Sequence, residues 1–106
     1  MSETPPPPIL RSVAEIATPQ AGKYMIQLCK HFGHRAPATY NDREGEIVFE
    51  VGKVGLRAAP ETLMLWTDAP ELNAVERLEQ VIESHLKRFA FREPELSFDW
   101  RRAPAI

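Results

Sequence analysis

A long amphipathic segment that ends at a proline most constrains how this chain can fold. From Pro70 onward, apolar residues recur at steps of three and four, which predicts a helix with one face toward a core. Asp68 can cap its start, and Pro70 suits a first turn, where an amide hydrogen has no partner in any case. Pro94 disfavours helical geometry at Glu93, so the helix ends by that residue. The apolar stripe consists of Leu72, Val75, Leu78, Ile82, Leu86 and Phe89.

The residues after this helix alternate with the period of a strand. Leu96, Phe98 and Trp100 are separated by single polar residues, which predicts one buried and one exposed face. The chain must therefore place a helix and a strand, joined at Pro94, against the same core.

Upstream, the pattern predicts a strand over residues 9–17 and a helix that Thr18 caps and that runs to about Gly33, where a glycine suits a left-handed exit. Short strands over residues 38–41, 46–51, 54–58 and 62–67 follow, with turns at residues 42–45 and at Gly52-Lys53. The core face of the first helix consists of Ala21, Tyr24, Met25, Leu28, Cys29 and Phe32.

The element order is thus β-α-β-β-β-β-α-β. Hairpin-linked strands between two helices predict an α+β fold, a two-layer sandwich in which a mostly antiparallel sheet carries both helices on one face. The other face is then either solvated or paired with a second subunit. Trp66 and Trp100 are the side chains to follow on that open face.

Size and composition fit one domain over residues 9–106, preceded by a disordered leader, residues 1–8, that contains four consecutive prolines. No apolar run reaches the roughly 20 residues of a membrane span, and no signal-peptide pattern opens the chain, so we expect a cytoplasmic protein without a membrane partner. A net charge of −2 argues against a nucleic-acid partner. The single cysteine, Cys29, excludes an internal disulfide and a thiolate metal cage, and its place on the core face predicts an inert thiol.

Two stretches of the sequence resemble the DUF2218 family of small bacterial proteins. They are Cys29-Lys-His-Phe-Gly-His34, and His85-Leu-Lys-Arg-Phe89 continued through Glu93-Pro94-Glu95 to Phe98-Asp-Trp100. The resemblance covers roughly residues 11–101. It implies no established biochemical activity. It implies a context, because similar domains occur beside or fused to flavin-dependent siderophore-interacting proteins, which release iron by reduction; such a flavoprotein is the partner that the resemblance suggests.

All three histidines lie in these two stretches. His31 and His34 are three residues apart at the end of the first helix, and His85 flanks the apolar stripe of the second. If the helices lie side by side, the three imidazoles can converge at their seam and suit zinc or ferrous iron, with Glu79 or Glu83 as an oxygen ligand. The alternative is structural: each histidine is a half-buried polar residue that bonds to a backbone carbonyl or caps a helix end.

Basic residues surround the same helix ends, and they predict a positive rim that could hold a carboxylate, a phosphate or an anionic siderophore. The alternative is that they only complement the negative poles of the two helices. The ligand-binding candidates are His31, His34, His85, Lys30, Arg35, Arg88 and Arg92.

The motifs of conventional enzymes are absent from the sequence: it has no glycine-rich phosphate loop, no Gly-x-Ser-x-Gly elbow and no Cys-x-x-Cys pair. We therefore expect a non-catalytic accessory or binding domain for a small anionic ligand or a partner protein, in iron and siderophore handling if the family context applies. Two alternatives stay open. One is a metal-binding protein or metal-dependent enzyme that uses the histidine cluster, and the other is a structural homodimer formed through the sheet face or a sheet edge. The sequence assigns no cofactor.

Overall fold

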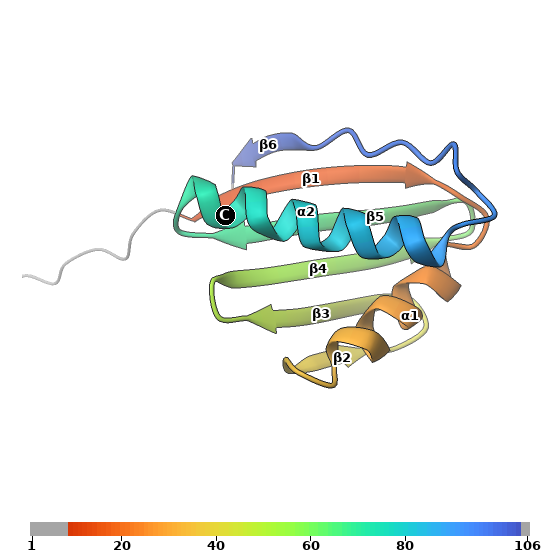
Figure 1. Cartoon of the computed structure of the whole chain (residues 1–106), viewed down its shortest axis with the longest axis horizontal. Helices are drawn as coiled ribbons and strands as arrows, with labels where there is room; N and C mark the ends of the chain where they lie inside the picture. The colour runs from red at the N-terminus through yellow and green to blue at the C-terminus, as the bar shows by residue number, and fades with distance from the viewer. Residues whose placement is uncertain (1–8, 105–106) are drawn as a thin grey trace, which may run out of the picture.

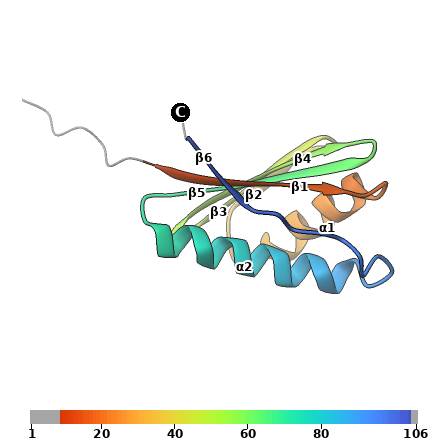
Figure 2. The same ribbon diagram turned by 90° about the horizontal axis from the view of Figure 1, so that it is seen from above.

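Six strands form one sheet, and two helices cover one of its faces in the computed structural model, which describes residues 9–104 (Figures 1 and 2). The leader predicted over residues 1–8 lies outside the described residues. The elements are β1 (Leu10–Ala17), α1 (Ala21–Phe32), β2 (Ala38–Tyr40), β3 (Glu44–Phe49), β4 (Gly52–Ala59), β5 (Thr62–Ala69), α2 (Leu72–Phe89) and β6 (Arg101–Pro104). Their order confirms the predicted α+β fold.

The strands lie in the order β2-β3-β4-β5-β1-β6, and every neighbouring pair is antiparallel. Hairpins join β2 through β5, whereas β1 inserts between β5 and β6 from the other end of the chain. Side chains alternate between the two faces along each strand. The helix-covered face therefore receives Ala14 and Ile16 of β1 and Leu63 and Leu65 of β5, all of which are buried.

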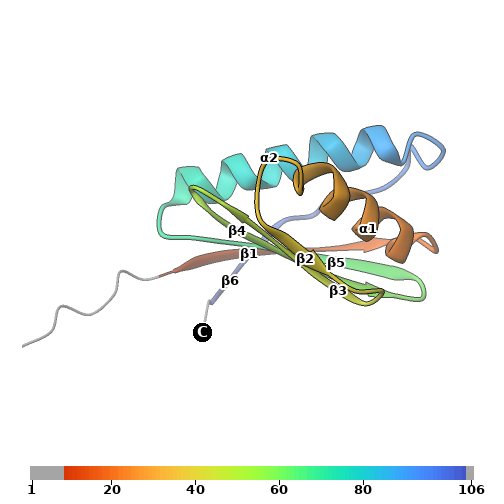
Figure 3. The same cartoon turned by 90° about the horizontal axis from the view of Figure 1, so that it is seen from below.

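The core lies between the sheet and the apolar stripes of the two helices (Figure 3). On α1 the predicted core face is confirmed, because its residues from Ala21 to Cys29 on that face are buried and Phe32 packs against them. On α2 the buried residues are Ala74, Val75, Leu78, Ile82 and Leu86. Each large side chain contributes about 1.5–3 kcal/mol by leaving water. Leu72, at the first position of the helix, is an exception and stays 49% exposed.

The start of α2 differs from the prediction. Asp68 does not cap the helix, because β5 continues to Ala69 through its pairing with β1, and the helix begins only at Leu72. The Asp68 carboxylate instead accepts two hydrogen bonds from Arg11, of 2.6 and 2.8 Å, across those two strands. Pairing with β1 thus keeps Asp68 in a strand, although aspartate as a residue type favours the N-cap of a helix.

The left-handed geometry expected at Gly33 and Gly45 is also wrong, because no described residue has a positive φ. Gly33 ends α1 in right-handed geometry, with φ of −61°. Gly45 lies within β3, and the β3–β4 hairpin turns at residues 50–51, so Gly52 already belongs to β4. Gly45 is needed for close packing, because a Cβ atom there would lie 2.8 Å from Cys29 Sγ.

The segment after α2 keeps the predicted alternation but not the predicted strand. Leu96, Phe98 and Trp100 all pack against the core, yet β6 begins only at Arg101. The connection runs beside β1 without pairing with it, and ladder bonds form only where Arg101 comes opposite Val13 (Figure 1). The indole of Trp100 donates a 3.0 Å hydrogen bond to Glu83 of α2, so Trp100 lies on the helix side and not on the open face.

Neither helix in residues 9–104 is long and apolar enough to cross a membrane.

Candidate functional site

The seam between α1 and α2 brings two of the three histidines together. The rings of His31 on α1 and His85 on α2 have centroids 4.9 Å apart and are tilted by 46°. His85 lies one turn beyond Val81, and its Nδ1 atom is 2.7 Å from the Val81 carbonyl oxygen. A carbonyl oxygen can only accept, so Nδ1 carries the proton and Nε2 keeps a lone pair. The hydrogen bond fixes the orientation of the ring, as one of the two sequence interpretations expected.

Phenylalanines enclose the histidine pair from the core side. The ring of Phe32 lies 4.9 Å from His31 and 4.8 Å from His85, and that of Phe89 lies 5.6 Å from His31. Phe49 of β3 packs behind Phe32 at 5.3 Å. The sequence assigned these aromatic residues to the core only. Because Phe32 and Phe89 are half-buried, they form an apolar wall against which the two imidazoles lie.

The charges around His31 all have the same sign. Partial burial lowers the pKa of His31, and the positive charges of His85, His34, Arg35 and Arg88 lower it further. Among residues 9–104, no carboxylate contributes a compensating effect on this histidine. An imidazolium at this position would therefore face like charges from both helices and from the turn after α1.

The remaining residues of the predicted rim are more scattered. His34 lies in the exposed turn after α1, and Lys30 is exposed on the last turn of that helix. Arg92 packs on the ring of Phe91, 5.5 Å from its centroid, and lines a different hollow together with Lys23 and Tyr24. The ion pairs of the described residues include none of Lys30, Arg35, Arg88 and Arg92. The rings of His31 and His85 are thus in contact, and the charges of His34, Arg35 and Arg88 lower the pKa of His31. We call His31, His85, Arg35 and Arg88 the histidine seam.

The two proposed carboxylate ligands point to the other side of α2. Glu79 pairs with Arg102 at 2.6 Å, and Glu83 pairs with Lys87 at 2.9 Å while it accepts from Trp100. Within residues 9–104, no three side chains among His, Cys, Asp and Glu converge in an arrangement that could hold a metal ion. A metal ion held by His31, His34 and His85 stays a prediction, which gains no carboxylate from Glu79 or Glu83 in this arrangement.

Cys29 of α1 lies in the hydrophobic core. Its side chain is fully buried, and burial raises the pKa of its thiol to about 11. At neutral pH the group is a neutral thiol without access to solvent, which agrees with the inert role predicted from its place on the helix face.

A buried polar network, which the sequence did not predict, joins Glu93 to Thr18 and Tyr24. The Thr18 hydroxyl donates to the Glu93 carboxylate at 3.0 Å, and the Tyr24 hydroxyl donates to the same carboxylate. Burial raises the pKa of Tyr24 to about 12, with a further contribution from Glu93. This network ties the end of α2 to the start of α1 and so supports the packing that creates the seam. The only sequence signal was Glu93-Pro94, which marks the end of a helix but not its partner.

Fold and site together define a small α+β domain with two histidines in contact between its two helices and arginines beside them. The chain belongs to DUF2218, a family described as uncharacterised proteins conserved in bacteria, whose model matches residues 13–101. Among solved structures, the NMR structure of PA4090 from Pseudomonas aeruginosa is similar, with a TM-score of 0.77 and 28% identity over 91% of this chain and 99% of that one. No curated protein matches the sequence.

Proposed function

We propose that this protein is a binding domain for a small anionic ligand held at the histidine seam. The observation that carries the proposal is the group of like charges that His31, His85, Arg35 and Arg88 form against an apolar wall. Holding positive charges together costs folding free energy, and a bound carboxylate or phosphate would remove that cost. The exposed position of His31, Arg35 and Arg88 leaves their donors accessible to such a ligand.

Protonation of the His31 imidazole is expected to strengthen binding. Without a ligand, the pKa of His31 lies below its ordinary value of 6.5 because of burial and the surrounding positive charges. A bound anion favours the imidazolium, so ligand and proton promote each other's binding. The affinity for an anion should therefore rise as the pH falls through and below 6.5.

The test is a titration of the protein with citrate and with inorganic phosphate, followed by NMR at a pH above and a pH below 6.5. Shifts should centre on His31, His85 and the backbone near Arg35, and they should be larger at the lower pH. Arg88→Gln should weaken binding several-fold, whereas Arg77→Gln, which removes another exposed arginine of α2, should not. Equal effects of the two variants, or no shift at the seam, would contradict the proposal.

The class of ligand and the partner protein can be proposed only from the family context. We propose an anionic siderophore as the ligand class and a siderophore-interacting flavoprotein as the partner, because the resemblance suggests this setting and the seam has the charge that such a ligand requires. Isothermal titration with a carboxylate siderophore, with and without bound iron, should give tighter binding than citrate. Binding no tighter than that of citrate would remove the siderophore and leave a general anion site.

Metal binding is the second candidate, and one feature of the seam favours it. A histidine whose Nδ1–H is held by a backbone carbonyl presents Nε2 in the manner of many metal ligands, and His85 has this arrangement. Elemental analysis of protein purified without a histidine tag, beside His31→Ala and His85→Ala, tests it. A stoichiometric metal ion in the parent protein that is absent from both variants would establish a metal site. A parent protein that folds without any bound metal would exclude it.

A homodimer through the open sheet face or a sheet edge also stays a prediction. Light scattering at micromolar concentration would decide it, and a monomer mass would contradict it.

A further inference from the structure

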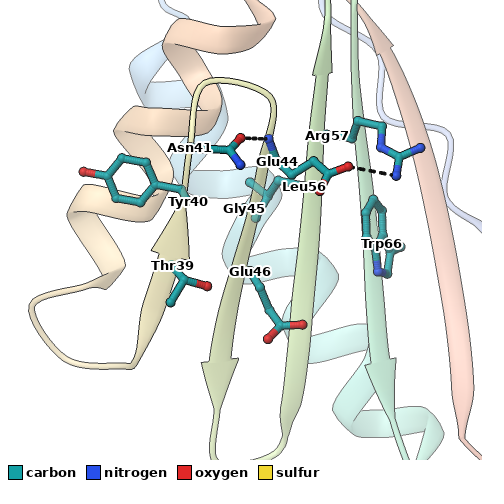
Figure 4. Close-up of a pocket in the computed structure, with 9 residues that line it drawn as sticks. All are labelled: Thr39, Tyr40, Asn41, Glu44, Gly45, Glu46, Leu56, Arg57 and Trp66. Carbon is teal, nitrogen blue, oxygen red and sulfur yellow. Dashed lines mark hydrogen bonds and ion pairs between the residues drawn. The ribbon is translucent and has the colours of Figure 1, made fainter.

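The sheet face opposite the helices contains a hollow that the proposed function does not use (Figure 4). It has a volume of about 450 Å³ and lies over β2, β3, β4 and β5. Its polar lining includes Thr39 of β2, Glu44 and Glu46 of β3, and Arg57 of β4, and Trp66 of β5 closes one side. Tyr40 also borders it, but its ring points away from the other labelled side chains.

Gly55 gives Trp66 its place at this hollow. The two residues are cross-strand partners, and a Cβ atom at Gly55 would lie only 2.0–2.3 Å from the indole atoms Cε2, Cζ2 and Nε1. The indole therefore lies over β4. The edge that carries its N–H group is the edge above Gly55, on the same face of the sheet as the hollow. Because Gly55 has no side chain, the indole can lie directly on the backbone of β4.

The carboxylates of the hollow are already neutralised. Glu44 pairs with Arg57 at 3.1 Å, and Glu46 lies 3.8 Å from Lys53. Each carboxylate still has free acceptor positions, and the guanidinium of Arg57 still has free N–H groups. The hollow thus offers acceptors and donors with little net charge, beside an aromatic ring.

We propose that this hollow binds one ring of a carbohydrate. A sugar ring combines hydroxyl groups, which donate to carboxylates and accept from a guanidinium or an indole N–H, with C–H faces that pack against an aromatic side chain. A charged ligand fits less well, because each carboxylate already faces a cation and the ligand would only replace one exposed ion pair by another. A purely apolar ligand would cover the exposed polar groups of the hollow without bonding to them.

The hollow is also preorganised. Most of its residues belong to paired strands, and Asn41 closes the β2–β3 turn by accepting hydrogen bonds from the amides of Arg43 and Glu44, of 2.8 and 2.9 Å. Glu46 is the direct partner of Thr39, and Glu44 that of Arg57. Little conformational entropy would be lost when a ligand binds. The shallow shape predicts weak binding, with Kd on the order of 1 mM, about −4 kcal/mol.

The test is an NMR titration of the full chain with the methyl glycosides of glucose, mannose and galactose up to several times the expected Kd. The indole N–H of Trp66 and the amides of residues 39, 46, 55 and 57 should shift for at least one of them. The indole N–H of Trp100, which bonds to Glu83 on the other side of the sheet, is an internal control and should not move. The absence of shifts for all three glycosides would overturn the proposal.

Two substitutions separate binding from stability. Glu46→Gln and Thr39→Val change polar groups of the exposed hollow, and each should weaken binding at least threefold while the protein stays folded. Glu15→Gln changes an exposed carboxylate on β1, outside the hollow, and should bind as the parent does. Equal loss in all three variants would overturn the assignment to this hollow. Titration with putrescine adds a further outcome: a cation that binds more tightly than every glycoside would replace the sugar by a cationic ligand and overturn the proposal.

Discussion

Charged side chains are arranged differently on the two sides of the sheet. On the open face, basic and acidic residues of neighbouring strands pair with each other: Arg11 with Asp68, Lys53 with Glu46, and Arg57 with Glu44. In the histidine seam, on the helix-covered side, the charges that act on His31 are all positive. Opposite charges in a pair compensate each other. Like charges held together lower the stability of the fold, and only solvent or a bound ligand of opposite charge can compensate them. This difference is why the seam, rather than the paired surface, is the anion site that we propose.

The largest expected effect compares two neighbouring residues of β5. Leu65 is fully buried under the helices, and Met64 is half-buried on the open face. Leu65→Ala should lower the free energy of unfolding by about 2–5 kcal/mol, because it leaves a cavity in packed surroundings. Met64→Ala should cost less than half as much. Urea denaturation of both variants gives the comparison, and equal costs would show that the open face is covered in solution, as in the predicted dimer.

The next effect concerns the network that holds the helices together. Tyr24→Phe removes a buried hydroxyl from a carboxylate and should cost about 1.5–3 kcal/mol. The pKa of Tyr24 rises from 10.0 to about 12 on folding, so this contribution is complete below pH 10 and decreases as the pH rises from 10 to 12. Denaturation midpoints of the parent should therefore fall over that range. Tyr24→Phe should show a smaller fall, and identical alkaline profiles would rule out this assignment.

The third effect concerns Gly55 on the open face, where the lack of a side chain is expected to contribute to stability. Gly55→Ala places a Cβ where the Trp66 indole now lies, so the ring must move and the variant should lose about 1–3 kcal/mol. The indole N–H resonance of Trp66 should shift, while that of Trp100 should not. Gly22→Ala is the control, because the nearest atom to its added Cβ is 4.0 Å away. Equal losses in the two variants would show that the strand glycine has no special packing role.

The smallest effect tests the like charges of the seam. Arg88→Gln removes one of the positive charges that lower the pKa of His31, so that pKa should rise toward 6.5. The His31 contribution to stability is present above pH 6.5 and is lost as the pH falls through the lowered pKa, because the folded state resists protonation. Arg88→Gln should reduce this acid sensitivity. An NMR titration of the His31 ring measures the pKa directly, and a value unchanged from the parent would show that Arg88 is too far away to matter.

Local patterns were enough to predict much of this molecule. The steps of three and four in the two helices follow from helix geometry alone, so the element order and the core faces of the helices could be read from residue types. The buried faces of β1 and β5 could not. The placement of histidines in the last turn of α1 and on α2 also followed from spacing. Exact turn positions did not, because Asp68, Gly45 and Gly52 each belong to a strand whose extent depends on its neighbour.

The sequence by itself determined which face of each helix meets the core, that α2 ends before Pro94, and that Cys29 lies on the core face of α1. Each of these depends on residues near one another in the chain. Only the tertiary structure decided that the ring of His85 lies against that of His31, that Trp66 covers Gly55, and that Glu93 accepts hydrogen bonds from Thr18 and Tyr24. Such contacts join residues far apart in sequence, and they depend on how the helices cross the sheet and on the register of the strands, which single residue types do not encode.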